Sequence, residues 1–276
     1  MFNIFNWFKP APDPKYFKFN LIVSTGRTGT KYLGKVLNQP KMGIVALHEP
    51  KPNLENIGYD LLTGKITNEQ AKEAILKNRK RIMSKVGNLT YIESNGGMVF
   101  LLPLLADIFP LLKVVHIVRN PIDLVKSGVN RSMKVNGEII QKYAMEERWR
   151  LKASDIKNDP YSHLWNEMDI YQRFMWLWNI KNKHIADFLK TGNRGITIKF
   201  EDIFHQTDNI GFDQLIKYFS LPDEIKNLLN NKRFESAKNK NAVTFAQNYE
   251  DWPEDRKLAL KEICNDLASK YNYSFH

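Results

Sequence analysis

A short loop near the amino end of the chain has the residue types that hold a phosphate group. Its residues are Gly26, Arg27, Thr28, Gly29, Thr30 and Lys31. An apolar run precedes it at 19–24, and apolar residues recur at helical spacing after it, which indicates a strand, a tight loop and a helix. Glycines let the backbone approach an anion, and the N–H groups of such loops point at it. With two full charges from Arg27 and Lys31, the loop is a candidate phosphate cradle.

Arg119 and Ser127 form a second candidate phosphate site and stand eight residues apart. Arg119 follows the apolar run 113–118, and Pro121 suits the first position of a helix that carries Ser127 two turns on. A guanidinium grips a phosphate through paired charge-assisted hydrogen bonds, and a hydroxyl fills a remaining lone pair. The alternative is an arginine that caps the helix beside a surface serine. The presence of both motifs in one chain, in this order, favours the phosphate site.

Two common nucleotide-binding patterns do not fit the loop. The Walker A pattern requires Gly, four residues, Gly-Lys and then a hydroxyl residue that holds magnesium. Here the second glycine, Gly29, comes two residues too early, and Tyr32 follows Lys31. The dinucleotide pattern Gly-x-Gly-x-x-Gly is also absent. A P-loop kinase therefore stays only as an alternative, together with a simple glycine-containing turn.

The loop resembles the 5′-phosphosulfate loop of sulfotransferases, in which Lys or Arg precedes Ser/Thr-Gly-Thr, as Arg27 does here. The spacing of Arg119 and Ser127 is similar to the 3′-phosphate motif of that family. The resemblance implies 3′-phosphoadenosine 5′-phosphosulfate (PAPS) as donor and phosphoadenosine phosphate (PAP) as product. It implies a hydroxyl or amine acceptor, carbohydrate or lipid-linked. No metal is expected, because no group of residues in the sequence has metal-ligand spacing. Arg27 or Lys31 would then neutralise charge on the bridging oxygen.

The candidates for a catalytic base follow a second expected strand at 42–47. His48 and Glu49 come directly after it, and several sulfotransferase families similarly place a Glu there, which some use as the base. Side chains alternate along a strand, so we expect His48 to face away from the crevice if Glu49 faces into it. The alternative is that Glu49 pairs with a lysine and His48 packs. Glu93 is a reserve candidate, because Glu93-Ser94-Asn95 lacks the His or Lys that sulfotransferases carry near this point.

The expected architecture is one α/β domain over 1–276, with an arm at 1–18 and a core at 19–276. About five strands, beginning near 19, 43, 89, 113 and 195, would form a mostly parallel central sheet with helices on both faces. Helices are predicted at 67–86, where Thr67 and Gln70 have capping-box spacing, over the whole aromatic-rich stretch from about 138 to 190, and after 253. The basic cluster at 77–85 is expected on a solvated helix face. The aromatic side chains Tyr171, Phe174 and Trp178 are expected to pack in the core instead of stacking on a sugar.

The charge composition favours some classes of binding partner over others. The chain has 41 Lys and Arg against 30 Asp and Glu, a formal net charge of +11. A polyanionic donor accounts for part of this excess, and an acidic acceptor or a membrane surface for more. Nucleic acid is disfavoured because the basic residues are scattered, without a basic arm, zinc-finger spacing or RNP motif. A non-catalytic polyanion-binding module is an alternative, but it does not account for Arg119 and Ser127. The acceptor and the oligomeric state stay open.

Four further expectations concern the N-terminal residues, the apolar run 99–118, the single cysteine and a basic loop near the C-terminus. Residues 1–10 are rich in aromatic side chains but too short for a signal peptide, so we expect an arm packed on the domain, with a weak membrane-surface contact as the alternative. We expect no membrane span and a cytoplasmic location, since polar residues and prolines interrupt the apolar run 99–118. The single cysteine, Cys264, is expected to pack in a helix. Sulfotransferases often close a basic C-terminal loop over the 3′-phosphate and adenine, and the resemblance makes Arg233, Lys238 and Lys240 candidates for that loop by position.

Overall fold

Five parallel strands form the central sheet of the computed structural model, which describes residues 10–275 apart from 133, 136–137, 140–150, 193, 206–207 and 229–245. The strands are β1 (Phe19–Ser24), β2 (Ile44–His48), β3 (Thr90–Ser94), β4 (Lys113–Val118) and β7 (Gly195–Lys199). Their order across the sheet is β2-β3-β1-β4-β7, and every pairing is parallel. The predicted α/β class and five-stranded sheet are confirmed.

The apolar strands have both faces covered, as parallel sheets require. All six residues of β1 are buried. Because side chains alternate along a strand, Ile22 packs in one hydrophobic cluster, while Leu21 and Val23 pack in the cluster on the opposite face. The carboxyl ends of the central strands β1 and β4 carry the two predicted phosphate motifs.

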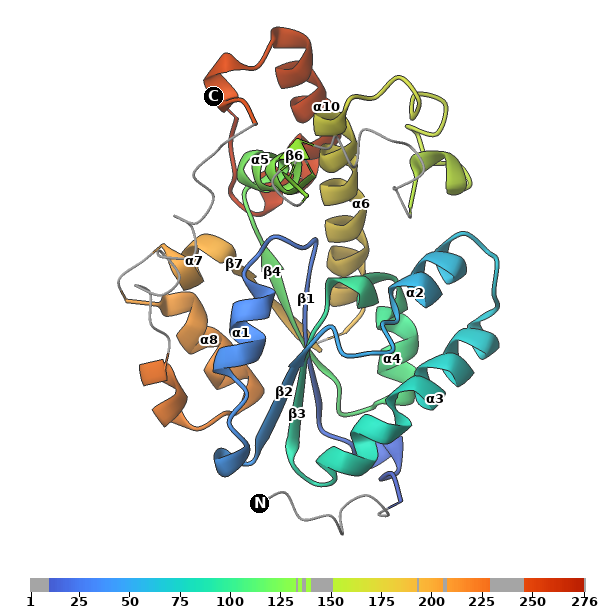
Figure 1. Ribbon diagram of the computed structural model, residues 1–276, viewed down its shortest axis with the longest axis vertical. Helices are drawn as coiled ribbons and strands as arrows, with labels where there is room; N and C mark the ends of the chain where they lie inside the picture. Colours follow the sequence, from blue (N-terminus) through green and yellow to red (C-terminus); the bar gives the residue numbers. More distant parts are fainter. Residues whose placement is uncertain are drawn as a thin grey trace.

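Helices lie on both faces of the sheet (Figure 1). One face is covered by α1 (Thr30–Val36), α7 (Phe200–Phe204) and α8 (Ile210–Phe219). The other face is covered by α2 (Glu55–Leu62), α3 (Asn68–Val86), the 3-10 helix η4 (Gly96–Leu101), α4 (Leu102–Ile108) and α6 (Ile170–Lys190). Helices α5 (Pro121–Ser132) and α10 (Glu254–Lys270) pack against α6, and an unpredicted antiparallel pair, β5 (Lys134–Val135) and β6 (Glu138–Ile139), follows α5.

Local sequence signals account for several helix boundaries. Thr67 and Gln70 form the predicted capping box at the start of α3, with hydrogen bonds of 3.3 and 2.8 Å. Pro121 is the first residue of α5, as expected. Cys264 is fully buried in α10, and burial raises the pKa of its thiol, which agrees with a packing role. Within the described part of the chain, no helix has the length and apolar character needed to cross a membrane.

Two expectations about the helices are wrong in detail. The stretch 151–169 consists of turns and one short 3-10 helix, and the long helix begins only at Ile170. On α3, Arg79 belongs to the basic cluster that we expected to be solvated, yet its side chain is 1% exposed. Of the expected N-terminal arm, residues 1–9 lie outside the described residues, and Phe17 packs in the core against Phe109.

Candidate functional site

The predicted phosphate loop is a tight turn at the carboxyl end of β1. The Ser24 hydroxyl oxygen accepts hydrogen bonds from the backbone N–H of Gly26 (3.1 Å) and from the Thr28 hydroxyl (2.7 Å). Gly26, Arg27 and Gly29 have φ angles of 92°, 57° and 71°. Glycine adopts this left-handed region freely, but Arg27 does so at a cost of about 1–2 kcal/mol. The loop therefore holds a strained backbone conformation of the kind that clusters at functional sites.

The second predicted motif meets this loop in space. Arg119 Nη1 donates a hydrogen bond of 2.7 Å to the carbonyl oxygen of Arg27. Arg27 Nε in turn donates to the hydroxyl of Ser127 at 3.0 Å. The Arg119 guanidinium stacks over the ring of Phe200, 4.4 Å from the ring centroid. The backbone carbonyl oxygen of Arg119 accepts a hydrogen bond of 2.9 Å from the Trp178 indole N–H. Residues about one hundred positions apart thus form one cationic site.

The electrostatics of this site favour an anion. Arg27 is exposed by surface area, yet the surrounding protein partly desolvates its guanidinium and so lowers its pKa, and the charges of Arg131 and Arg119 lower it further. Burial also lowers the pKa of Arg119, although Asp123 and Glu201 oppose that shift. Arg119 Nε is buried and has no hydrogen-bond partner among the residues described. A bound phosphate would reduce the repulsion between these guanidinium groups and offer an acceptor to the unused donor.

Sequence reasoning missed Arg131 and Gly96. Arg131 stands four residues after Ser127, so both lie on one face of α5, and that spacing is the signal that could have identified it. Gly96 begins η4, and a Cβ atom there would lie 2.8 Å from the carbonyl oxygen of Ser24. A glycine is therefore required for η4 to pack against the phosphate loop. Its signal was the pair Gly96-Gly97, separated from the end of β3 by Asn95 alone.

Both candidate bases lie at the carboxyl end of β2, but not as the strand alternation predicts. Glu49 has a left-handed φ of 44°, which ends the extended conformation. The two side chains consequently approach each other, with His48 Nε2 4.0 Å from Glu49 Oε1. The strand alternation on which we based the orientation of His48 ends at Glu49, and the expectation that His48 faces away from the crevice stays a prediction. The Nδ1 of His48 lies 2.9 Å from the hydroxyl oxygen of Ser94, while the Glu49 side chain is 48% exposed.

Glu93, the reserve candidate, has a structural role instead. Its side chain is fully buried and forms a two-bond ion pair with Arg79, at 2.9 and 2.7 Å. Its oxygens also accept hydrogen bonds from the Tyr91 hydroxyl (2.8 Å) and from Asn95 Nδ2 (2.9 Å). Arg79 Nη1 donates to the Pro52 carbonyl at 2.8 Å, which ties the segment after Glu49 to α3. A carboxylate enclosed in this way is shielded from solvent, which disfavours it as a base.

Of the four remaining candidate cations, only Lys31 belongs to the described residues. Lys31 lies in the first turn of α1 and is exposed. The basic-loop candidates Arg233, Lys238 and Lys240 lie outside the described residues. Across the described ranges, no three His, Cys, Asp or Glu side chains are grouped so that they could hold a metal ion.

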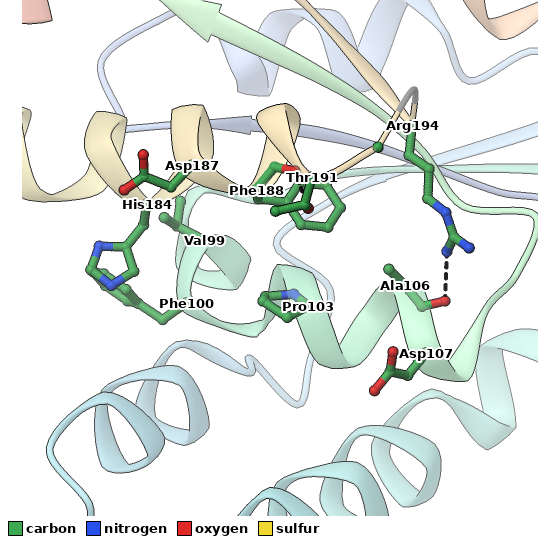
Figure 2. Close-up of a pocket in the computed structure, with 11 residues that line it drawn as sticks. Val99, Phe100, Pro103, Ala106, Asp107, His184, Asp187, Phe188, Thr191 and Arg194 are labelled. Atoms are coloured by element: carbon green, nitrogen blue, oxygen red, sulfur yellow. Dashed lines mark hydrogen bonds between the residues drawn. The ribbon is translucent and has the colours of Figure 1, made fainter.

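A pocket of about 520 Å³ lies elsewhere, between the η4–α4 segment and the end of α6. Figure 2 shows apolar side chains such as Phe100, Pro103 and Phe188 along it, with Arg194 and Asp107 at one end. Arg194 Nη1 donates to the carbonyl of Ala106 at 2.7 Å. This pocket shares no lining residue with the phosphate loop, with Arg119 and Ser127, or with Glu49.

Comparisons with known proteins identify the fold. No protein-family model and no curated protein sequence matches the chain. Among solved structures, a sulfotransferase from Mycobacterium avium is 12% identical with a TM-score of 0.58, and the match covers 96% of this chain and 79% of that one. The sulfotransferase domain of the curacin biosynthetic pathway is 14% identical with a TM-score of 0.54, over 94% and 99% of the two chains. A sulfotransferase from Alicyclobacillus acidocaldarius is 14% identical with a TM-score of 0.53, over 94% and 97%. The chain has the sulfotransferase fold.

Proposed function

We propose that the protein transfers a sulfuryl group from PAPS to a hydroxyl or amine acceptor. The observation that carries the proposal is the contact between the two predicted motifs, Arg119 to the Arg27 carbonyl at 2.7 Å and Arg27 to Ser127 at 3.0 Å. A cationic site with a buried, unused donor suits a ligand with more than one phosphate, and PAPS has phosphates at both ends of its ribose. The fold shared with solved sulfotransferases supports the same reading.

In this proposal the two motifs bind different ends of the donor. The backbone N–H groups of the loop, with Arg27 and Lys31, would hold the phosphosulfate end. Arg119, Ser127 and Arg131 would hold the 3′-phosphate. Fixed cations at the point where charge develops are the main means by which transfers of this type are accelerated.

Glu49 is the proposed base. As the acceptor oxygen forms its bond to sulfur, the bond from sulfur to the bridging oxygen breaks. The acceptor proton passes to the Glu49 carboxylate, and the negative charge left on the phosphate is balanced by Arg27 or Lys31. His48, 4.0 Å from Glu49, would orient or assist it. We propose a carbohydrate or a lipid-linked molecule as the acceptor, since either carries hydroxyl groups of this kind.

Thermal-shift measurements with three ligands test the donor. PAP is expected to raise the melting temperature at micromolar concentration, whereas ATP with magnesium and heparin are expected to do so weakly or not at all. A library of hydroxyl and amine acceptors, incubated with labelled donor and read by mass spectrometry, then tests the transfer, with an arm in excess EDTA. A shift with ATP and magnesium but not with PAP would favour a kinase, and a shift with heparin alone would favour a polyanion-binding module.

A further inference from the structure

The turn between β4 and α5 is held in place by side chains of α6 and α7. It consists of Arg119 and Asn120, and so carries the arginine of the second phosphate motif. The Arg119 carbonyl accepts the bond of 2.9 Å from Trp178, and the backbone N–H of Asn120 donates to Glu201 Oε1 at 3.1 Å. Asn120 Oδ1 accepts a hydrogen bond of 2.9 Å from the backbone N–H of Ile122, so Asn120 caps α5. The turn therefore sets the position of both the arginine and the start of α5.

The pairing of β4 with β7 brings Glu201 to this turn. Val118, the last residue of β4, pairs with Lys199, the last residue of β7. Phe200 and Glu201 follow directly as the first residues of α7. The Phe200 ring packs on the Arg119 guanidinium, while Glu201 accepts from the next N–H along the chain. Two consecutive residues of α7 thus hold the side chain and the backbone of the turn.

Tyr273, in the segment that follows α10, holds the other oxygen of Glu201. Its hydroxyl donates to Glu201 Oε2 at 2.7 Å, and the residue is 8% exposed. Its backbone N–H donates to the Ala268 carbonyl at 3.0 Å, which turns this segment back onto α10. Burial, and next the charge of Glu201, raise the pKa of Tyr273, so the hydroxyl keeps its proton and remains a donor. Both carboxylate oxygens of Glu201 therefore have a fixed donor.

A carboxylate close to a phosphate site repels the ligand, so its presence there needs a compensating role. Glu201 does not engage Arg119 Nε, which is buried without a partner among the described residues, and Arg119 Nη1 donates to the Arg27 carbonyl. We propose that Glu201 and Tyr273 are positioning residues for the 3′-phosphate. Glu201, held by Tyr273, fixes the turn from which Arg119 and α5, with its Ser127, meet that phosphate. The inference rests on the proposed function, in which Arg119 binds the 3′-phosphate of the donor.

Calorimetry with PAP and with AMP, which lacks the 3′-phosphate, tests the inference, with the AMP affinity read by displacement of bound PAP. Glu201→Ala removes the acceptor of the Asn120 N–H, and is expected to weaken PAP binding about tenfold but AMP binding less than about twofold. Glu201→Gln keeps an oxygen for that N–H and should bind PAP within about twofold of the wild type. Tyr273→Phe, which leaves Glu201 without its second donor, should weaken PAP about threefold. Glu224→Ala is the matched control, because it removes the same charge from an exposed position in the 3-10 helix η7 (Asp223–Leu228).

Amide hydrogen exchange measured by nitrogen-15 NMR reads the turn directly, without a ligand. The Asn120 N–H is expected to exchange at least about tenfold faster in Glu201→Ala than in the wild type or in Glu201→Gln. An unchanged PAP affinity in Glu201→Ala, or an equal loss of PAP and AMP affinity, would overturn the inference. So would a Glu201→Gln variant that binds PAP as weakly as Glu201→Ala, or an Asn120 exchange rate that does not change. Failure of the wild type to bind PAP would instead contradict the proposed function.

Discussion

Replacing Arg79 by methionine is expected to destabilise the protein strongly, although Arg79 belongs to a cluster of basic residues that resembles a solvated helix face. The substitution leaves the Glu93 carboxylate buried with only the Tyr91 and Asn95 donors. Loss of one partner of a buried ion pair typically costs about 3–5 kcal/mol. The entropy of unfolding is about 2.1 cal/mol/K per residue, so for 276 residues this corresponds to a fall in melting temperature of roughly 5–9 °C.

Thermal and urea unfolding at pH 7 would measure this loss. Lys80→Met is the matched control, because Lys80 is the exposed neighbour of Arg79 on α3 and loses the same charge. The double variant Arg79→Met/Glu93→Leu removes both charges, and we expect it to recover at least half of the loss. Equal melting temperatures for Arg79→Met and Lys80→Met would refute the assignment of a buried ion pair. So would a double variant whose loss is the sum of the two single losses.

Three further predictions concern the donor, the base and the response to pH. Calorimetry is expected to show that Arg119→Ala weakens PAP binding by roughly 2–4 kcal/mol and Ser127→Ala by about 1 kcal/mol. If the wild type binds adenosine phosphosulfate equally well with and without a 3′-phosphate, these two residues do not hold that phosphate. Glu49→Gln should leave donor affinity intact but slow the chemical step about 100-fold or more in single-turnover assays. His48→Asn should have a smaller effect. A wild-type rate for Glu49→Gln would rule out Glu49 as the base. Burial lowers the pKa of His116 to about 4 from 6.5, so the folded state resists a proton that the unfolded state accepts. Stability should therefore be lost as the pH falls from 6.5 towards 4, by about 2 kcal/mol between pH 6.5 and 5. Urea unfolding of the wild type and of His116→Gln would measure this, and an equal slope in both would contradict it.

The sequence by itself determined the local elements and the two cationic motifs. The apolar run 19–24, the glycines after it and Pro121 act over a few residues, through burial, backbone freedom and ring geometry. Strand, loop and helix therefore lie where the pattern predicts them. The parallel sheet also followed, since strands alternating with helices have few ways to bury both faces.

The tertiary structure decided which side chains meet, because those contacts join segments far apart in the chain. Arg79 was expected on a solvated helix face and Glu93 was a reserve candidate for the base, and only the folded chain makes them a buried pair. Glu49 was expected to follow the alternation of a strand, but its left-handed φ, with the hydrogen bond to Ser94, turns it towards His48. Lys181, a buried residue of α6, carried no signal of its own, because its burial depends on contacts with Gly96 of η4 and Tyr59 of α2, which are far from it in sequence. Periodicity and spacing report local backbone structure, whereas the charge environment of a side chain is set by neighbours that the chain brings together only on folding.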